Sequence, residues 1–154
     1  MVGKGRTVDI LSILLSVIGW EKDRASKVSD RRVEAARLNA EVAGEAARAV
    51  DMLNFAMPRI LKRCAELCPD QPELVESCAK TLDTMRANAM QICAQSEGIK
   101  EQIASAGSSA EWDKLVSGLH EWRVTASRFV PEADRVIRRY EEVLDTEAAR
   151  REVG

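Results

Sequence analysis

Residues 73–106, ELVESCAKTLDTMRANAMQICAQSEGIKEQIASA, carry the pattern that decides the fold. Apolar or small side chains recur there in alternating steps of three and four, at Val75, Cys78, Leu82, Met85, Ala89, Ile92, Ser96, Ile99 and Ile103. This period puts one stripe along a single face of an α-helix and is typical of helices that pack along a coiled-coil-like seam. The stretch therefore predicts one long helix, about 50 Å in length at 1.5 Å per residue.

Two further stretches repeat with a helical period. Residues 109–149 keep the three-and-four rhythm, through Trp112, Leu115, Leu119, Trp122, Ala126, Phe129, Ala133, Val136, Tyr140 and Val143. Residues 21–68 carry a stripe with more steps of four, through Ala35, Leu38, Val42, Ala46, Ala49, Leu53, Met57, Ile60, Cys64 and Leu67. We expect a long helix over each range, the earlier one kinked near Pro58 because proline removes an amide donor. The alanines and Gly44 within residues 39–50 predict that a neighbouring helix approaches closely there.

The breaks between these ranges have the residue types that end and begin helices. Residues 68–73, CPDQPE, end one helix, and Asp70 is the predicted cap of the next. Residues 107–111, GSSAE, predict a capping box in which Ser108 caps the last helix and Glu111 bonds back to it. Because both loops are short, consecutive helices are expected to run antiparallel.

The opening stretch TVDILSILLSVIGW, residues 7–20, is far more apolar than the rest of this charged chain. As a helix over 6–19 it would spread its large apolar side chains over about 220° of its circumference, wider than the stripe of an ordinary surface helix. These residues are Ile10, Leu11, Ile13, Leu14, Leu15, Val17, Ile18 and Trp20. Exposing all of them would cost about 12–24 kcal/mol, more than a typical domain's stability of about 5–15 kcal/mol. They must be buried in the bundle, on a partner or second copy, or in a bilayer.

The predicted fold class is all-α. We expect an up-and-down antiparallel helical bundle with one short apolar N-terminal helix and three long helices, forming a single domain over residues 1–154. The first helix, about 21 Å long, is too short to cross a hydrocarbon layer of about 30 Å unaided. Asp9 and the residues WEKDR after the run do not fit a cleaved signal peptide.

In length, helix order and apolar first helix, the outline resembles the helical-bundle executioner domains of necroptotic and fungal incompatibility proteins. In that family the N-terminal helix leaves a four-helix bundle and damages membranes. The resemblance is architectural, so no residue roles are carried over. It implies membrane insertion of the first helix as the alternative to a purely protein-binding role.

Composition narrows the choice of partners. The chain has 154 residues, 45% hydrophobic and 31% charged, with a formal net charge of −2. No global positive field attracts nucleic acid, so nucleic acid is not the expected partner. Four cysteines in a chain of this length do not form a secreted disulfide scaffold. We expect a reducing compartment, the cytoplasm, with membrane association through the first helix as the alternative.

The residues that carry chemistry are sparse. Cys64, Cys68 and Cys78 would lie near one helix turn and could begin a metal site or a redox pair, but no fourth ligand is placed beside them, so buried structural cysteines are expected. His120 is the single histidine, and no phosphate-binding or nucleophile motif is present. The prediction is therefore a protein that is not an enzyme and has no cofactor and no metal.

A basic cluster near the C-terminus is the second candidate surface. Arg128, Arg135, Arg138 and Arg139 form a predicted face for a polyanion or a protein partner. The main functional prediction is a non-catalytic bundle that binds another protein or itself, as an adaptor, accessory subunit or sensor. The alternative is a membrane-disrupting bundle, and the weaker alternative is a subunit that contacts a nucleic-acid backbone.

Overall fold

The computed structural model describes residues 19–153, with side chains described from Lys27 onward. The helices are α2 (Gly19–Leu67), α3 (Pro72–Ser105), α4 (Ser109–Ala126) and α5 (Phe129–Val153), and the described residues contain no strand. The predicted all-helical fold is confirmed over this range. Residues 1–18 lie outside the described range, and they hold all of the predicted first helix except its last residue. Also outside the described range lie the side chains of Ile10, Leu11, Ile13, Leu14, Leu15, Val17, Ile18 and Trp20.

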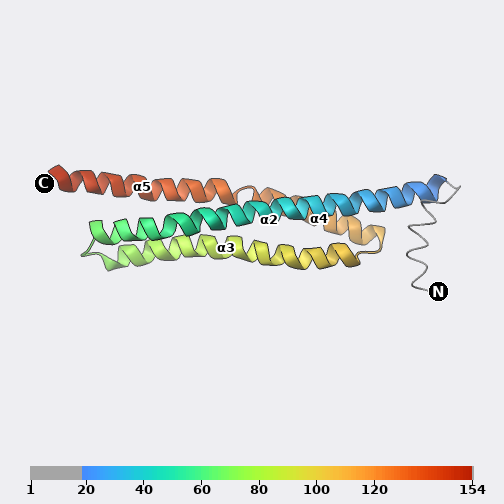
Figure 1. The fold of residues 1–154 in the computed structure, drawn as a ribbon, viewed down its shortest axis with the longest axis horizontal. Coiled ribbons are helices and arrows are strands. Elements are labelled where there is room, and N and C mark those ends of the chain that lie inside the picture. Colours follow the sequence, from blue (N-terminus) through green and yellow to red (C-terminus); the bar gives the residue numbers. More distant parts are fainter. Residues whose placement is uncertain (1–18, 154) are drawn as a thin grey trace.

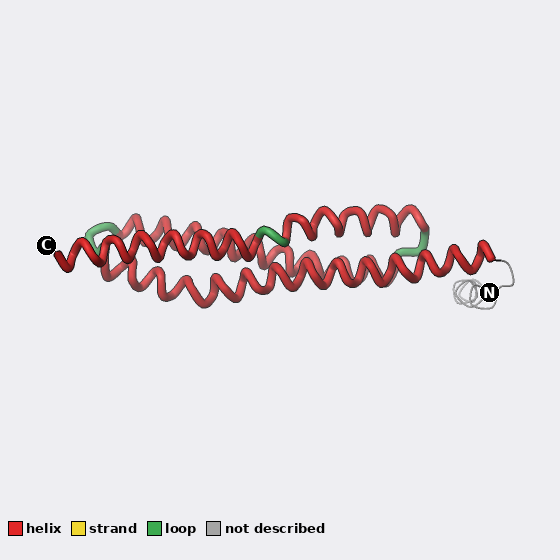
Figure 2. Tube along the Cα trace, turned by 90° about the horizontal axis from the view of Figure 1, so that it is seen from above, coloured by secondary structure: helices red, strands yellow, loops and turns green. Residues whose placement is uncertain are grey.

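Helix α2 is the axis of the molecule, and α3, α4 and α5 each pack against it. In Figure 1, α3 returns antiparallel along α2, and α4 and α5 then follow one another in the direction of α2. The result is an elongated rod with a connection near each end and one between α4 and α5 midway (Figure 2). Three helical rows therefore pack together up, down and up.

Single helices project from the two ends of this rod. The first turns of α2 extend beyond the connection from α3 to α4, and the last turns of α5 extend beyond the turn from α2 to α3 (Figure 1). Within residues 27–34 no side chain is fully buried, and only Val28, Arg31 and Glu34 are half-buried. This part of α2 is therefore packed only weakly against the other described helices.

The predicted stripe of α2 supplies nearly half of the buried apolar residues of the described chain. Its buried members are Ala35, Leu38, Val42, Ala46, Ala49, Leu53, Met57, Ile60 and Cys64. They contribute to two apolar clusters, one with α4 and the end of α3 around Trp112, and one with α5 and the start of α3 around Leu82. One stripe contacts three helices because the broad buried arc of α2 faces α3 on one side and the α4–α5 row on the other.

Small side chains lie between the two clusters. Ala46 and Ala49 of α2, Ala89 of α3 and Ala126 of α4 are all buried. The predicted close contact in residues 39–50 is therefore right for Ala46 and Ala49 but wrong for Ala40, Gly44 and Ala47, which are exposed. That glycine is exposed, and a Cβ added to it would meet nothing within 4 Å. Gly44 lies on the face of α2 opposite the core, about half a turn from Ala46.

A buried polar pair joins α2 and α3 about two helical turns away from Ala46 and Ala89, beside Leu38. The Asn39 side-chain amide donates to the backbone oxygen of Ser96 at 3.0 Å, and the Ser96 hydroxyl donates to Asn39 Oδ1 at 2.9 Å. Asn39 is 2% exposed and Ser96 is fully buried. Because a buried polar group without a partner is costly, the reciprocal bonds set the register of α3 on α2. Ser96 belongs to the predicted stripe, whereas Asn39 was not anticipated.

The prediction of one continuous helix over 109–149 is wrong. Helix α4 ends at Ala126 and α5 begins at Phe129. Pro131 explains the break, because proline has no amide hydrogen to donate to the oxygen of Ser127 and its ring clashes with that carbonyl. In the first turn of a new helix the missing donor has no consequence. Pro58, in contrast, lies inside α2, which continues to Leu67; the kink near Pro58 stays a prediction.

The buried stripe of the last row departs from the predicted one after Ala133. Ala133 is buried as predicted, but Ile137 and Leu144 are buried where the continuous pattern pointed to Val136 and Val143. Val136 is half-buried and still packs against the same cluster, whereas Val143 is 57% exposed.

The two predicted caps have opposite outcomes. The Ser108 hydroxyl accepts from the Glu111 amide at 3.2 Å, and the Glu111 carboxylate accepts from the Ser108 amide at 2.8 Å, so the capping box is confirmed. The Asp70 cap is wrong, because α3 begins at Pro72 with Gln71 as its N-cap and no side-chain cap bond. Proline at the first position already lacks one of the amides that a cap would satisfy.

Candidate interaction surface

The reverse face of α2, opposite the core, is one of the described surfaces that expose large apolar side chains. Val33 is 66% exposed and Phe55 is 77% exposed. They lie eleven residues before and eleven after the exposed Gly44. Eleven residues make about three helical turns, so all three residues share one face. The small residues of this face are Ala36, Ala40, Gly44 and Ala47, all exposed. We call the strip from Val33 to Phe55 the α2 outer face.

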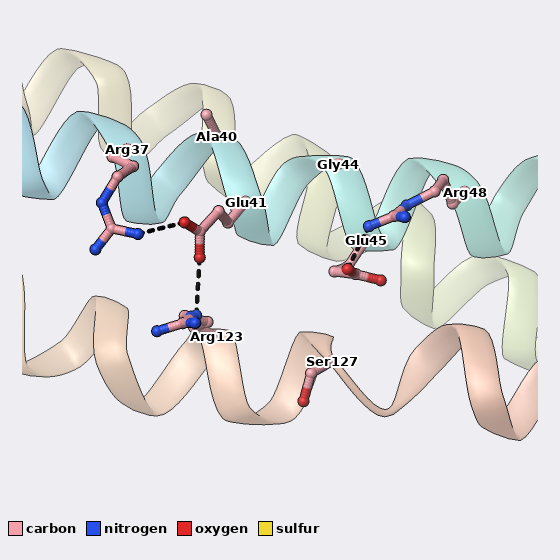
Figure 3. A pocket seen from close by; sticks show the side chains of 8 residues that line it. All are labelled: Arg37, Ala40, Glu41, Gly44, Glu45, Arg48, Arg123 and Ser127. Atoms are coloured by element: carbon pink, nitrogen blue, oxygen red, sulfur yellow. Dashed lines mark hydrogen bonds and ion pairs between the residues drawn. The ribbon is translucent and has the colours of Figure 1, made fainter.

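A groove of about 750 Å³ runs along the middle of the α2 outer face, beside the end of α4. Figure 3 shows Ala40 and Gly44 on α2, with Arg123 and Ser127 on the facing helical row. With only small side chains on its floor, the groove leaves the α2 backbone open to a close neighbour. Its openness at Gly44 agrees with the empty space around a Cβ built at that residue.

Charged residues line the same groove. Glu41 bonds Arg37 on its own helix, and its second carboxylate oxygen accepts from Arg123 Nε at 2.8 Å. Arg48 pairs with Glu45 one turn further on (Figure 3). The lining therefore carries three guanidinium groups and two carboxylates, a mixed pattern suited to a surface of alternating charge and not to a polyanion.

The predicted arginine face lies on another part of the molecule. Arg128, Arg135, Arg138 and Arg139 are all exposed, at the start and along the first half of α5. Arg138 pairs with Asp134 at 2.8 Å. Within residues 27–153 the other three form no ion pair. The structure thus leaves these three charges available to solvent.

Ion pairs join α2 to the α4–α5 row along its length. Arg31 contacts Asp113 at 2.8 Å, His120 Nε2 lies 3.0 Å from Glu34, and Arg63 contacts Asp145 at 2.6 Å. Arg123 with Glu41, and Arg59 with Glu141, complete the set. Exposed pairs of this kind are worth at most about 1 kcal/mol each. His120, the single histidine, makes a surface hydrogen-bond contact with Glu34 between α4 and α2.

Cys64 and Cys78 lie in the apolar cluster that α2, α3 and α5 form. Cys64 and Cys78 are buried, Cys68 and Cys93 are half-buried, and all four are free thiols. Burial raises the pKa of Cys64, and the nearby Cys68 raises it further. Burial also raises the pKa of Cys78, opposed by a hydrogen bond from the Tyr140 hydroxyl. Raised pKa values keep these thiols protonated and weakly nucleophilic at neutral pH.

Between residues 27 and 153, no three histidine, cysteine or acidic side chains converge as metal ligands would. None of the four described helices has an apolar segment long enough to cross a membrane. The Trp112 side chain is fully buried, with the guanidinium of Arg32 5.6 Å from the centroid of its ring.

The chain matches no protein-family model, no curated protein and no solved structure. The function is therefore argued from geometry. The α2 outer face was not anticipated from the sequence, although one signal was present. Val33, Ala36, Ala40, Gly44, Ala47 and Phe55 recur in helical steps on the side opposite the core stripe. A helix with apolar or small residues on both sides has two faces to cover.

Proposed function

We propose that this protein is a non-catalytic binding protein whose α2 outer face docks on another protein chain, as in an adaptor or accessory subunit. One observation carries the proposal. The 49-residue helix that every other described helix packs against leaves Val33 and Phe55 in solvent on a face floored by alanines and glycine. Large apolar side chains aligned on one face are typical of a surface that a partner covers.

The form of the surface supports a helical partner. The exposed residues of the α2 outer face recur in steps of three and four, the pattern by which helices pack as coiled coils. Small residues at its centre let a second helix come close. The charged residues beside the groove supply a polar rim, as in most protein–protein interfaces.

A site-specific crosslinking experiment tests the proposal. A photo-reactive phenylalanine analogue replaces Phe55 in the full-length protein, which is then irradiated in its native cells. The matched control carries the same analogue at Val143, which is 57% exposed on α5. We expect a protein adduct at position 55 and little at position 143. Absence of an adduct at position 55, or equal adducts at both, would contradict the proposal.

Membrane insertion is the second candidate. One support is the set of eight large apolar side chains between Ile10 and Trp20. The other is the shortage of apolar partners in the neighbouring described part of α2, since only Val28 and Val33 are large and apolar within residues 27–34. The test is co-sedimentation of the full chain with anionic liposomes. We expect Leu14→Asp to abolish pelleting and Ser12→Asp, on the polar side of the same stretch, to preserve it. Failure of the unmodified chain to pellet would remove this candidate.

Contact with a nucleic-acid backbone is the weakest candidate. Its support is the exposed set of Arg128, Arg135 and Arg139, which have no acidic partner within residues 27–153. A net charge of −2 opposes it. If these arginines bind phosphates, the affinity of the chain for nucleic acid should fall steeply as the salt concentration rises. The variant Arg135→Glu should also lower that affinity. Salt-independent binding, or none, would exclude it.

A further inference from the structure

We propose that the partner of the α2 outer face is a second copy of this chain, bound antiparallel about a two-fold axis at Gly44. This inference rests on the proposed function and names the occupant of the same surface. In such a dimer, a residue a given number of positions before Gly44 lies level with the residue the same number of positions after it on the second copy. The arrangement of this face around Gly44 fits that geometry at several positions.

The apolar side chains match first. Val33 and Phe55 lie eleven positions on either side of Gly44. The two-fold axis therefore brings Val33 of each copy level with Phe55 of the other, so both exposed side chains are covered twice in one dimer. Gly44 lies at the axis itself, where the two backbones are nearest. A side chain is least tolerable at that point, and the open space around Gly44 provides the room.

The charges match in the same register. Arg37 lies seven positions before Gly44 and Asp51 seven positions after it. Asp51 is exposed and forms no ion pair within residues 27–153. Arg37 uses one nitrogen for Glu41 and keeps donors free for Asp51 of the second copy.

A second charge pair follows on the flank beside α4. Glu41 lies three positions before Gly44, and Arg48 lies four positions after it. In the dimer, Glu41 of one copy and Arg48 of the other therefore differ in level by only one residue. In a two-fold antiparallel pair the flanks beside α4 of both copies lie on the same side, so these side chains face each other. Opposite charges across an interface favour one register over its alternatives.

The size of the surface sets the expected strength. From Val33 to Phe55 the strip is about 33 Å long and about 10 Å wide, a few hundred Å² on each copy. Interfaces of that size belong to weak or transient associations. The dimer is therefore expected to form and dissociate with protein concentration.

Sedimentation equilibrium of the full chain over a range of concentrations tests the inference. We expect a reversible change from monomer to dimer mass. Phe55→Asp should raise the dissociation constant on the order of 100-fold, because it affects both symmetric contacts. Val143→Asp, an exposed residue of α5, should leave the constant unchanged. Circular dichroism of each variant confirms that the helices are intact.

A charge-exchange experiment tests the register. Arg37→Asp and Asp51→Arg should each weaken the dimer on the order of 10-fold, and the double variant should recover the original affinity. Recovery within one chain is excluded, because these residues are about 21 Å apart along the same helix.

The outcomes separate this inference from the proposed function. A chain that stays monomeric at every concentration, while position 55 crosslinks to a different protein in cells, overturns the dimer and leaves the proposed function standing. A dimer that Phe55→Asp does not weaken, or that fails to recover in the double variant, overturns this interface. If the chain neither self-associates nor forms any crosslink at position 55, both the dimer and the proposed function are overturned.

Discussion

At the scale of single residues, the reciprocal bonds between Asn39 and Ser96 hold α3 in register on α2. Each side chain satisfies the other in the core between α2 and α3, next to Leu38 and Val42. Apolar contacts have little directionality, whereas a buried polar pair is satisfied in one register only.

Ser96→Ala should lower the free energy of unfolding by about 1–3 kcal/mol, since it leaves Asn39 Oδ1 buried without its donor. Urea denaturation followed by circular dichroism measures the change. Ser117→Ala is the matched control, because Ser117 is exposed on α4 and bonds to no side chain within residues 27–153. Equal stability of the two variants would show that the pair contributes nothing.

The buried thiols predict a pH dependence. Burial raises the pKa of Cys64 and Cys78 above the ordinary value of 9.0. As the pH rises through 9.0 the unfolded chain loses these protons first, so it binds fewer protons than the folded chain and the free energy of unfolding falls. Urea titrations at increasing pH measure the slope. The double variant Cys64→Ala, Cys78→Ala should show a shallower slope, and an unchanged slope would contradict the burial argument.

At the scale of elements, periodicity was sufficient to place α2 and α3 and most of their buried residues. It failed at two kinds of position. Pro131 divides the last row, and a stripe extrapolated across that break selects Val143 where the structure buries Leu144. The N-cap of α3 was misplaced because Pro72 begins the helix without a side-chain cap. Local backbone chemistry decides both, whereas periodicity reports only which face is buried.

The capping box of α4 gives a prediction at this scale. Ser108→Ala should cost about 1 kcal/mol of stability, because the Glu111 amide loses its acceptor at the start of the helix. The same urea assay measures it, again beside Ser117→Ala. If Ser108→Ala lowers the free energy of unfolding no more than Ser117→Ala does, water replaces the Ser108 hydroxyl as acceptor for the Glu111 amide without loss of stability.

At the scale of the whole molecule, the rod has a continuous core on one side of α2 and an exposed apolar strip on the other. The α2 outer face could not be predicted from the sequence. A helix with apolar or small residues on two faces does not indicate which face the rest of its own chain covers. Only the packed positions of α3 and the α4–α5 row distinguish the core stripe from the α2 outer face. The first predicted surface, the residues from Ile10 to Trp20, stays a prediction.

The most direct test of the central claim, that the α2 outer face is covered by a second copy, is hydroxyl-radical footprinting of the unmodified full chain at concentrations well below and well above the dissociation constant. Oxidation of Phe55 reports the cover on that face, and oxidation of Val143 reports a surface that should stay open. We predict that Phe55 becomes protected as the concentration rises while Val143 does not. Equal oxidation of Phe55 at both concentrations would contradict the account.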